Sequence, residues 1–265
     1  MIEHKEEGDR SMNNTLFKIF IAGDSTAADY PEAQRPMAGW GQMLPRFFTK
    51  DVRVENHASC GRSTVSFIRE NRLDQILESI RSNDYLLIQF GHNDEKPDDR
   101  FTDPHGTYKM YLKMYVDGAR ERGALPVLIT PVNRRRFDSH GEFYLTHGEY
   151  PAAMISLAQE LGVPLVDLEK RSRDYFAKLG EEATKKLFMH MEPGESVNYP
   201  EGVHDDTHFS EQGALAVAKL VVDGLRALEL PWVSTDSVAQ RALNTFVCLD
   251  LIGEALPDTA QSLGE

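Results

Sequence analysis

Five short runs rich in apolar and β-branched residues recur along the chain and predict strands. Residues 16–22 end at a glycine, and residues 84–90 are apolar at nearly every position, which is typical of a strand buried on both faces. The other runs are residues 52–56, 125–130 and 163–168. Apolar positions spaced for a helix lie between them, at about 39–48, 73–81, 107–122, 146–161 and 210–228, with another helix ending near 179.

This regular alternation of strand and helix predicts an α/β fold. Short connections between such elements are typical of a parallel sheet with right-handed crossovers and helices on both faces. We expect one domain over residues 16–230, after a polar lead-in at 1–15, with a long polar loop at 192–206. The remaining residues, 231–265, are expected to form a helical extension that either wraps the domain or joins two copies in a homo-oligomer.

Charge and composition narrow the classes of partner. The chain has 29 Lys and Arg against 42 Asp and Glu, a net charge of −13, which argues against nucleic acid or an anionic membrane as the main partner. No apolar run approaches the ~18 residues of a membrane-spanning helix. The polar residues 1–14 do not resemble a secretory signal, so we expect a cytoplasmic protein. Cys60 and Cys248 are expected to be buried free thiols.

Residues suited to acyl transfer follow three of the predicted strands. Ser25, Gly61 and Asn93 each lie in such a loop, and ligands bind at the carboxyl edge of open parallel sheets. A serine needs a base, and the base needs a carboxylate that orients it. His208 and Asp205, just before the last helix, are the candidates. The backbone N–H groups of Ser25 and Gly61 and the Asn93 amide are then candidate oxyanion donors.

Each of these residues also has a plainer interpretation. Ser25 is alternatively a helix N-cap, and Asn93 a residue that stabilises a turn. Asp206 is a rival to Asp205 as the orienting carboxylate. His92 and Asp94 form a His-x-Asp pair, but no cluster completes a metal site around them, so we expect wall or structural residues and no metal or cofactor.

The motifs resemble, in order and spacing, the four blocks of the SGNH (GDSL) hydrolase superfamily. These blocks are Gly23-Asp24-Ser25, Gly61, Gly91-His92-Asn93-Asp94 and Asp205-x-x-His208. Further segments are similar to the rhamnogalacturonan acetylesterase branch, carbohydrate esterase family 12: Gly23-Asp24-Ser25-Thr26, Gly39-Trp40-Gly41, Asn56-x-x-x-x-Gly61-Arg62-Ser63 and Pro131-Val132-x-Arg134-Arg135-x-Phe137.

The resemblance implies a flavodoxin-like three-layer α/β/α sandwich with a five-stranded parallel sheet. It also implies Ser25 as nucleophile, His208 as base and Asp205 as its orienter, with Ser25, Gly61 and Asn93 forming the oxyanion hole. The implied reaction is removal of an acetyl group from a sugar hydroxyl, without a metal. The family pattern has no counterpart to the residues after Pro231.

Three residues are candidates for substrate binding. Arg134 and Arg135 are either part of a solvated charged face or ligands for the carboxylates of an acidic saccharide. Trp40 either stacks on a sugar ring or belongs to the core. We therefore expect a serine esterase acting on an acetylated pectin-derived oligosaccharide. The alternatives are an acetylated xylan fragment, a short-chain lipid ester or a thioester, and, from another class, a binding module without catalysis.

Overall fold

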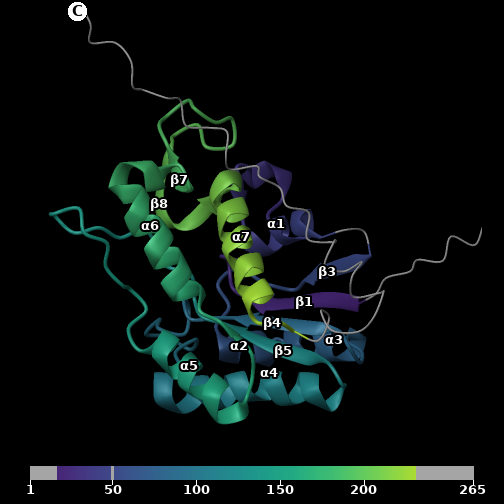
Figure 1. Cartoon of the computed structure of the whole chain (residues 1–265). Helices are drawn as coiled ribbons and strands as arrows, with labels where there is room; N and C mark the ends of the chain where they lie inside the picture. Colours follow the sequence, from purple (N-terminus) through teal and green to yellow (C-terminus); the bar gives the residue numbers. More distant parts are fainter. Residues whose placement is uncertain (1–16, 49–50, 231–265) are drawn as a thin grey trace, which may run out of the picture.

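A five-stranded parallel sheet forms the centre of the computed structural model, which describes residues 17–48 and 51–230 (Figure 1). Its strands lie in the order β3-β1-β4-β5-β6. Their bounds are β1 Phe17–Gly23, β3 Val52–Asn56, β4 Tyr85–Gln89, β5 Leu125–Ile129 and β6 Leu165–Val166. Counted along the chain, the order is 2-1-3-4-5, that of flavodoxin-like folds. The expected α/β fold is therefore confirmed.

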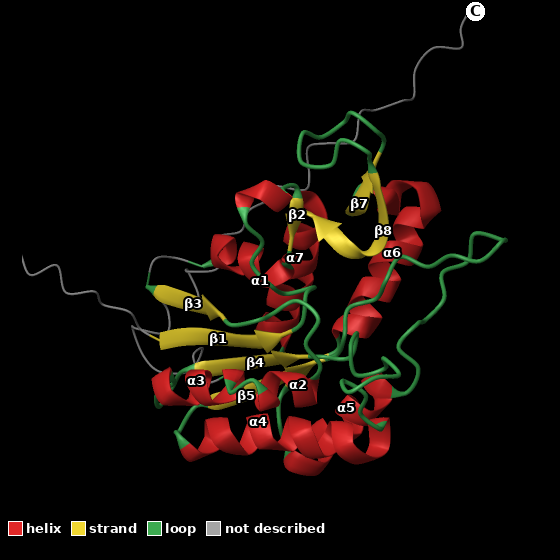
Figure 2. Ribbon diagram, turned by 180° about the vertical axis from the view of Figure 1, so that it is seen from behind, coloured by secondary structure: helices red, strands yellow, loops and turns green. Residues whose placement is uncertain are grey.

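Helices cover both faces of this sheet. Figures 1 and 2 show α2 Thr64–Arg69, α3 Arg72–Ser79, α4 Lys109–Glu121 and α5 Tyr150–Leu161 on one side of the sheet. On the other side lie α1 Trp40–Met43, α6 Leu168–Lys185 and α7 Glu211–Ala227. Shorter helical turns are η1 Glu32–Gln34, η2 Leu44–Phe47 and the π-helical η3 Pro104–Tyr108.

Two apolar cores hold these layers together. In β1, Ile19 and Ile21 belong to the core on the side of α1 and α7, whereas Phe20 and Ala22 belong to the core on the side of α3, α4 and α5. All four side chains are fully buried. Successive strand residues point to opposite faces, so a continuous apolar run is needed to fill both cores.

A second, antiparallel sheet was not predicted. It contains β2 Met37–Ala38, β7 Phe188–Met191 and β8 Val203–Ser210 in the order β2-β8-β7 (Figure 2). The loop predicted at residues 192–206 is therefore shorter, because its end pairs with β7 as part of β8. We call β2, β7 and β8 the small sheet below.

Several other boundaries differ from the prediction. The helix α2 was not predicted, and α6 continues to Lys185 with a break at Gly180. The helix expected to start at residue 146 begins at Tyr150, because Gly148 has a left-handed φ of 48°. The expected extension at residues 231–265 and Cys248 lie outside the described residues.

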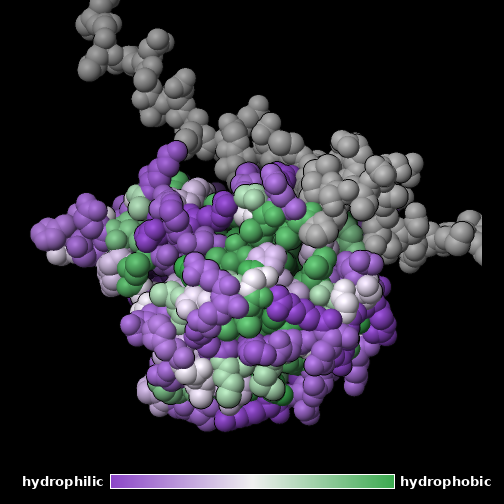
Figure 3. Space-filling model, turned by 60° about the horizontal axis from the view of Figure 1, so that its bottom comes forward, coloured by the Kyte–Doolittle hydropathy of each residue, from purple (hydrophilic) through white to green (hydrophobic). Residues whose placement is uncertain are grey.

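The polarity of the surface and the length of the helices bear on contact with a membrane. The face in Figure 3 is mostly hydrophilic, with smaller hydrophobic areas between the polar side chains. Among residues 17–48 and 51–230, no helix is both long and apolar enough to cross a membrane.

Candidate active site

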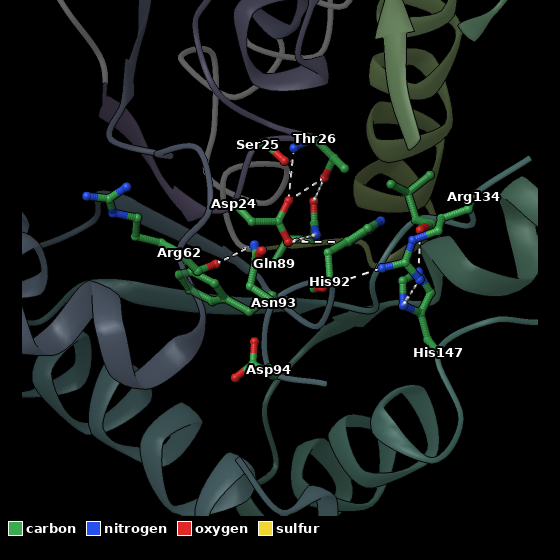
Figure 4. Close-up of polar contacts among 12 residues, drawn as sticks. Asp24, Ser25, Thr26, Arg62, Gln89, His92, Asn93, Asp94, Arg134 and His147 are labelled. Carbon is green, nitrogen blue, oxygen red and sulfur yellow. Dashed lines mark hydrogen bonds and ion pairs between the residues drawn. The ribbon is translucent and has the colours of Figure 1, made fainter. Parts of the chain in front are cut away.

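Ser25 lies in a tight turn at the carboxyl end of β1. The fully buried Asp24 carboxylate accepts hydrogen bonds from the Thr26 backbone N–H at 2.9 Å and from the Thr26 hydroxyl at 2.7 Å (Figure 4). The Gln89 side chain, at the end of β4, donates to the same carboxylate at 3.2 Å. The Tyr30 hydroxyl donates to the Ser25 carbonyl at 2.8 Å. These contacts fix the backbone that carries the Ser25 hydroxyl.

A chain of hydrogen bonds joins Ser25 to two residues of β8. The His208 Nε2 atom lies 3.0 Å from Ser25 Oγ, and His208 Nδ1 lies 2.7 Å from Asp205 Oδ2. The other Asp205 oxygen accepts from the backbone N–H groups of Thr207 at 2.7 Å and His208 at 3.0 Å. The structure thus brings together the three residues that the sequence pattern singled out.

The electrostatics of Asp205 favour an ionised carboxylate. Partial burial raises its pKa, but the hydrogen bond from His208, the positive charge on that ring when protonated, and the two backbone donors together lower the pKa to about 2. A carboxylate at this position accepts the Nδ1 proton of His208 and leaves Nε2 as the acceptor for the Ser25 hydroxyl.

Ser25 and His208 line a cavity of about 360 Å³. Its wall also includes Gly61, Asn93, Lys96 and Arg134. Gly61 has a φ of 79°, which favours glycine, in the loop after β3. The buried Asn93 donates one amide hydrogen to the Arg62 carbonyl at 3.0 Å. Ser25, Gly61 and Asn93 thus line the same cavity.

The residue after Asn93 anchors this loop in the core. The buried Asp94 carboxylate accepts from the Thr64 backbone N–H at 3.0 Å, the Thr64 hydroxyl at 2.5 Å and the Thr102 hydroxyl at 2.9 Å. Burial dominates over these hydrogen bonds and raises the pKa of Asp94 to about 7. Tyr150 donates to the Asp94 carbonyl at 2.8 Å. Asp94 is therefore structural, as expected.

His92 forms part of the cavity wall together with Ser25. Its Nδ1 atom lies 3.3 Å from Asp24, and its ring packs edge to face on His147 with centroids 4.3 Å apart (Figure 4). Burial lowers the pKa of His92 to about 4, despite the nearby Asp24 charge, so the ring is neutral at neutral pH. Among the described residues, no cluster of three or more His, Cys, Asp or Glu side chains is suited to hold a metal ion.

Two candidate substrate-binding residues do not reach the cavity. Trp40 is fully buried and donates from Nε1 to Gln89 at 2.8 Å, so its ring belongs to the core and cannot stack on a sugar. Arg135 is buried, donates to Asp206 at 3.1 Å and to the Glu181 carbonyl at 2.8 Å, and is not on the cavity wall. Of the two alternatives for Trp40, the core is the one that the structure shows, and Arg135 is neither on the cavity wall nor part of a solvated face.

Arg134 does line the cavity, but its charge is already paired. Its guanidinium donates to Glu95 at 2.5 Å and lies beside His147 (Figure 4).

Asp206, the rival orienter, binds His190 at 2.8 Å instead of His208. Cys60 was expected to be buried, but this prediction is wrong: its side chain is exposed on the cavity wall.

Three residues of the site were not predicted from the sequence. Tyr30 and Gln89 hold the Ser25 turn, and Lys96 lies on the cavity wall. Gln89 had a signal in the sequence, because it is a polar residue at the end of an otherwise apolar run. Tyr30 and Lys96 lie in irregular segments, where spacing does not indicate a contact.

Comparison with known proteins places this geometry in a family. The model of the GDSL-like lipase/acylhydrolase family matches residues 21–216. The chain is 51% identical to the rhamnogalacturonan acetylesterase RhgT of Bacillus subtilis (strain 168) over 81% of this chain and 91% of the relative. It is 42% identical to YesY, a probable rhamnogalacturonan acetylesterase of the same organism, over 80% of this chain and 94% of the relative.

A solved structure agrees with this assignment. The structure of YxiM from Bacillus subtilis superposes with a TM-score of 0.71 at 31% sequence identity, covering 81% of this chain. The match spans 57% of the YxiM chain, so that protein is considerably longer than the matched part. The extent of the family match and the identity to RhgT lead to one conclusion: this chain belongs to the GDSL-like lipase/acylhydrolase family.

Proposed function

We propose that this carboxylic ester hydrolase removes acetyl groups from rhamnogalacturonan saccharides derived from pectin. The observation that carries the reaction class is the chain of hydrogen bonds from Asp205 through His208 to Ser25, at the wall of an open cavity. The acetylated saccharide as substrate is supported by the relatives RhgT and YesY, whose names state this activity and whose similarity extends over most of this chain.

In the proposed acylation step, Ser25 Oγ attacks the acetyl carbonyl while His208 Nε2 takes its proton. The two atoms are 3.0 Å apart, a distance suited to direct proton transfer. Asp205 keeps the proton on Nδ1 and stabilises the imidazolium that forms. The tetrahedral intermediate collapses when the sugar oxygen leaves with the proton from His208, and the acetyl group stays on Ser25.

The developing oxyanion needs donors that are in place before the reaction. The backbone N–H groups of Ser25 and Gly61 and the Asn93 amide are proposed for this role. Asn93 is held by Arg62 on one side and by the buried Asp94 in the next position, so its amide is fixed in advance. Loss of one such donor typically costs on the order of 10²–10³ in rate.

Deacylation repeats these steps with water as the nucleophile. His208 takes a proton from the water, which attacks the acetyl-Ser25 ester, and Ser25 then leaves with that proton. The products are acetate and the free enzyme. The neutral His92 beneath the site does not compete for the proton, because burial keeps its pKa at about 4.

Acetate release from two substrates tests the proposal. Acetylated rhamnogalacturonan oligosaccharides and acetylated xylan oligosaccharides are compared at equal acetyl concentration, with Ser25→Ala as the control. We expect preference for rhamnogalacturonan, abolished in the variant. Preference for xylan, also abolished in the variant, would contradict the substrate and leave the chemistry intact. Release that survives in Ser25→Ala would contradict the chemistry.

Two further expectations are predictions only. A homo-oligomer through residues 231–265 is tested by measuring the mass in solution before and after deletion of that segment. A cytoplasmic location is tested by fractionating cells that express the protein.

A further inference from the structure

Lys96 is an exposed cation on the wall of the active-site cavity. Its ammonium group has no hydrogen bond or ion pair with any residue that the structure describes. The other cations around the cavity are paired: Arg134 donates to Glu95 at 2.5 Å, and Arg62 to Glu70 at 2.9 Å. The positive charge of Lys96 is therefore available to a molecule that enters the cavity.

The backbone beneath Lys96 is fixed. The Lys96 N–H donates to the Asn93 carbonyl at 3.1 Å and closes a turn of four residues. The other three side chains of this turn are held: Asn93 by the Arg62 carbonyl, Asp94 by Thr64, and Glu95 by Arg134. Of the four side chains in this turn, only that of Lys96 has no partner among residues 17–48 and 51–230, and it shares the turn with a proposed oxyanion donor.

The charge around Lys96 also differs from that of the whole protein. The chain carries a net charge of −13, which repels an acidic molecule at long range. Among the described residues, none that lines the cavity carries a carboxylate. Asp98, the acidic residue whose charge interacts with Lys96, is held by two nitrogens of Arg100, at 2.9 and 2.6 Å. An anionic group that reaches the cavity therefore meets a cation without a competing carboxylate on the wall.

We propose that Lys96 is a specificity-determining residue, which binds the carboxylate of a uronic acid residue beside the acetyl ester. This inference rests on the proposed function, because rhamnogalacturonan contains galacturonate. In this inference Lys96, instead of Arg134 or Arg135, is the cation that binds the carboxylate of the saccharide. The ammonium of a lysine is a flexible point charge that can follow a carboxylate on a mobile chain.

The test compares a charged substrate with its neutral counterpart. Acetylated rhamnogalacturonan oligosaccharides are used as they are and after conversion of their carboxylates to primary amides. Wild type, Lys96→Ala and the control Lys178→Ala are assayed for acetate release. Lys178 is exposed on α6, outside the cavity wall, so Lys178→Ala removes the same charge from the chain without touching the site.

We expect wild type and Lys178→Ala to prefer the acidic substrate about tenfold in kcat/KM, and Lys96→Ala to lose this preference, mainly through a higher KM. Added salt should reduce the preference of wild type and leave Lys96→Ala unaffected, because it screens this contact. An equal loss on both substrates, or an unchanged preference in Lys96→Ala, would overturn the inference. If wild type hydrolyses an aryl acetate but neither oligosaccharide, the proposed substrate itself is wrong, and the inference falls with it.

Discussion

The two sheets of this protein are built in different ways, yet each supplies part of the hydrogen-bonded arrangement of Ser25, His208 and Asp205. In the parallel sheet, all five residues of β4 are buried. In the small sheet, Phe209 is the only fully buried residue among the eight of β8. Ser25 follows a strand of the first sheet, whereas His208 and Asp205 lie on β8 of the second.

This difference shows where the information for each strand lies. A strand of the parallel sheet is specified by its own apolar residues, which fill two cores. The extended conformation of β8 depends on its partners, with Phe209 opposite Phe188 on β7 and Ala38 on β2. Phe188 and Phe209 also pack together, with ring centroids 5.0 Å apart. The position of the base thus depends on residues far away in sequence.

Two backbone hydrogen bonds near the site tie segments that follow strands of the parallel sheet to neighbouring elements. The Trp40 N–H donates to the Thr26 carbonyl at 2.9 Å and ties the turn beside Ser25 to α1. The Arg135 N–H donates to the Asp206 carbonyl at 2.8 Å and ties the segment after β5 to β8. The ion pair of the buried Arg135 with Asp206 reinforces this second link and holds the Arg135 side chain, which is not part of the cavity wall.

The largest expected effect comes from removing the side chain of Ser25 or that of His208. Ser25→Ala and His208→Ala should each lower kcat by about 10⁴-fold or more, and the double variant should lose little beyond either one. The reason is that nucleophile and base act as one unit across the two sheets. The measurement is kcat on an aryl acetate, with circular dichroism as the control for folding. Losses that multiply in the double variant would show that the two residues act independently.

The parallel sheet could be predicted from sequence because its signal is local. The run at residues 84–90 predicts a strand, and the structure has β4 at Tyr85–Gln89. The strand β8 reads Val-His-Asp-Asp-Thr-His-Phe-Ser, which contains too many polar residues to predict a strand. Its pairing partners lie about 15 and 170 residues away, and no local pattern indicates such contacts.

The three residues joined by hydrogen bonds could be predicted from the sequence. Which large or charged side chains line the cavity could not. Ser25, Asp205 and His208 lie in motifs with a fixed spacing, and the structure joins them by hydrogen bonds. The alternatives for Trp40 and Arg135 stayed open because a sequence does not show whether a large or charged side chain is buried or paired. Their roles depend on Gln89 and Asp206, which are distant in sequence.

Two further substitutions, one beside the small sheet and one in the parallel sheet, are expected to have smaller effects. They should differ in whether kcat falls together with stability. A Cβ on Gly213, in the first turn of α7, would lie 1.8 Å from the Leu187 carbonyl oxygen just before β7. Gly213→Ala should therefore shift the small sheet and lower both Tm and kcat. In Leu86→Ala, a cavity in the parallel sheet should cost about 2–5 kcal/mol of unfolding free energy. Because Leu86 lies in β4 away from the carboxyl end, kcat of the folded enzyme should stay near that of wild type.

Both variants are measured by thermal unfolding and by kcat at a temperature where each remains folded. A Gly213→Ala enzyme with wild-type kcat would show that the His208 position tolerates movement of the small sheet. A Leu86→Ala enzyme with strongly reduced kcat would show that the parallel sheet also transmits strain to the site.

The last contrast is between two carboxylates whose pKa values shift in opposite directions. Asp205, on the small sheet, has its pKa lowered to about 2, so its stabilising effect is lost only as the pH falls below about 4. Burial raises the pKa of Asp94, after the parallel sheet, from 3.8 to about 7. The folded state then binds the Asp94 proton more tightly than the unfolded state, and this stabilisation is lost as the pH rises from about 4 to 7.

Asp94→Asn should reveal this loss as a pH-dependent difference from wild type. The neutral amide does not titrate, so the stability of the variant relative to wild type should rise between pH 4 and 7, by at most about 4 kcal/mol. The comparison must be a difference, because the lowered pKa of His92 makes wild type more stable as the pH rises through the same range. Urea unfolding at pH 4, 5, 6 and 7 measures it. Parallel pH profiles for the two proteins would show that Asp94 keeps an ordinary pKa and that its three hydrogen bonds offset its burial.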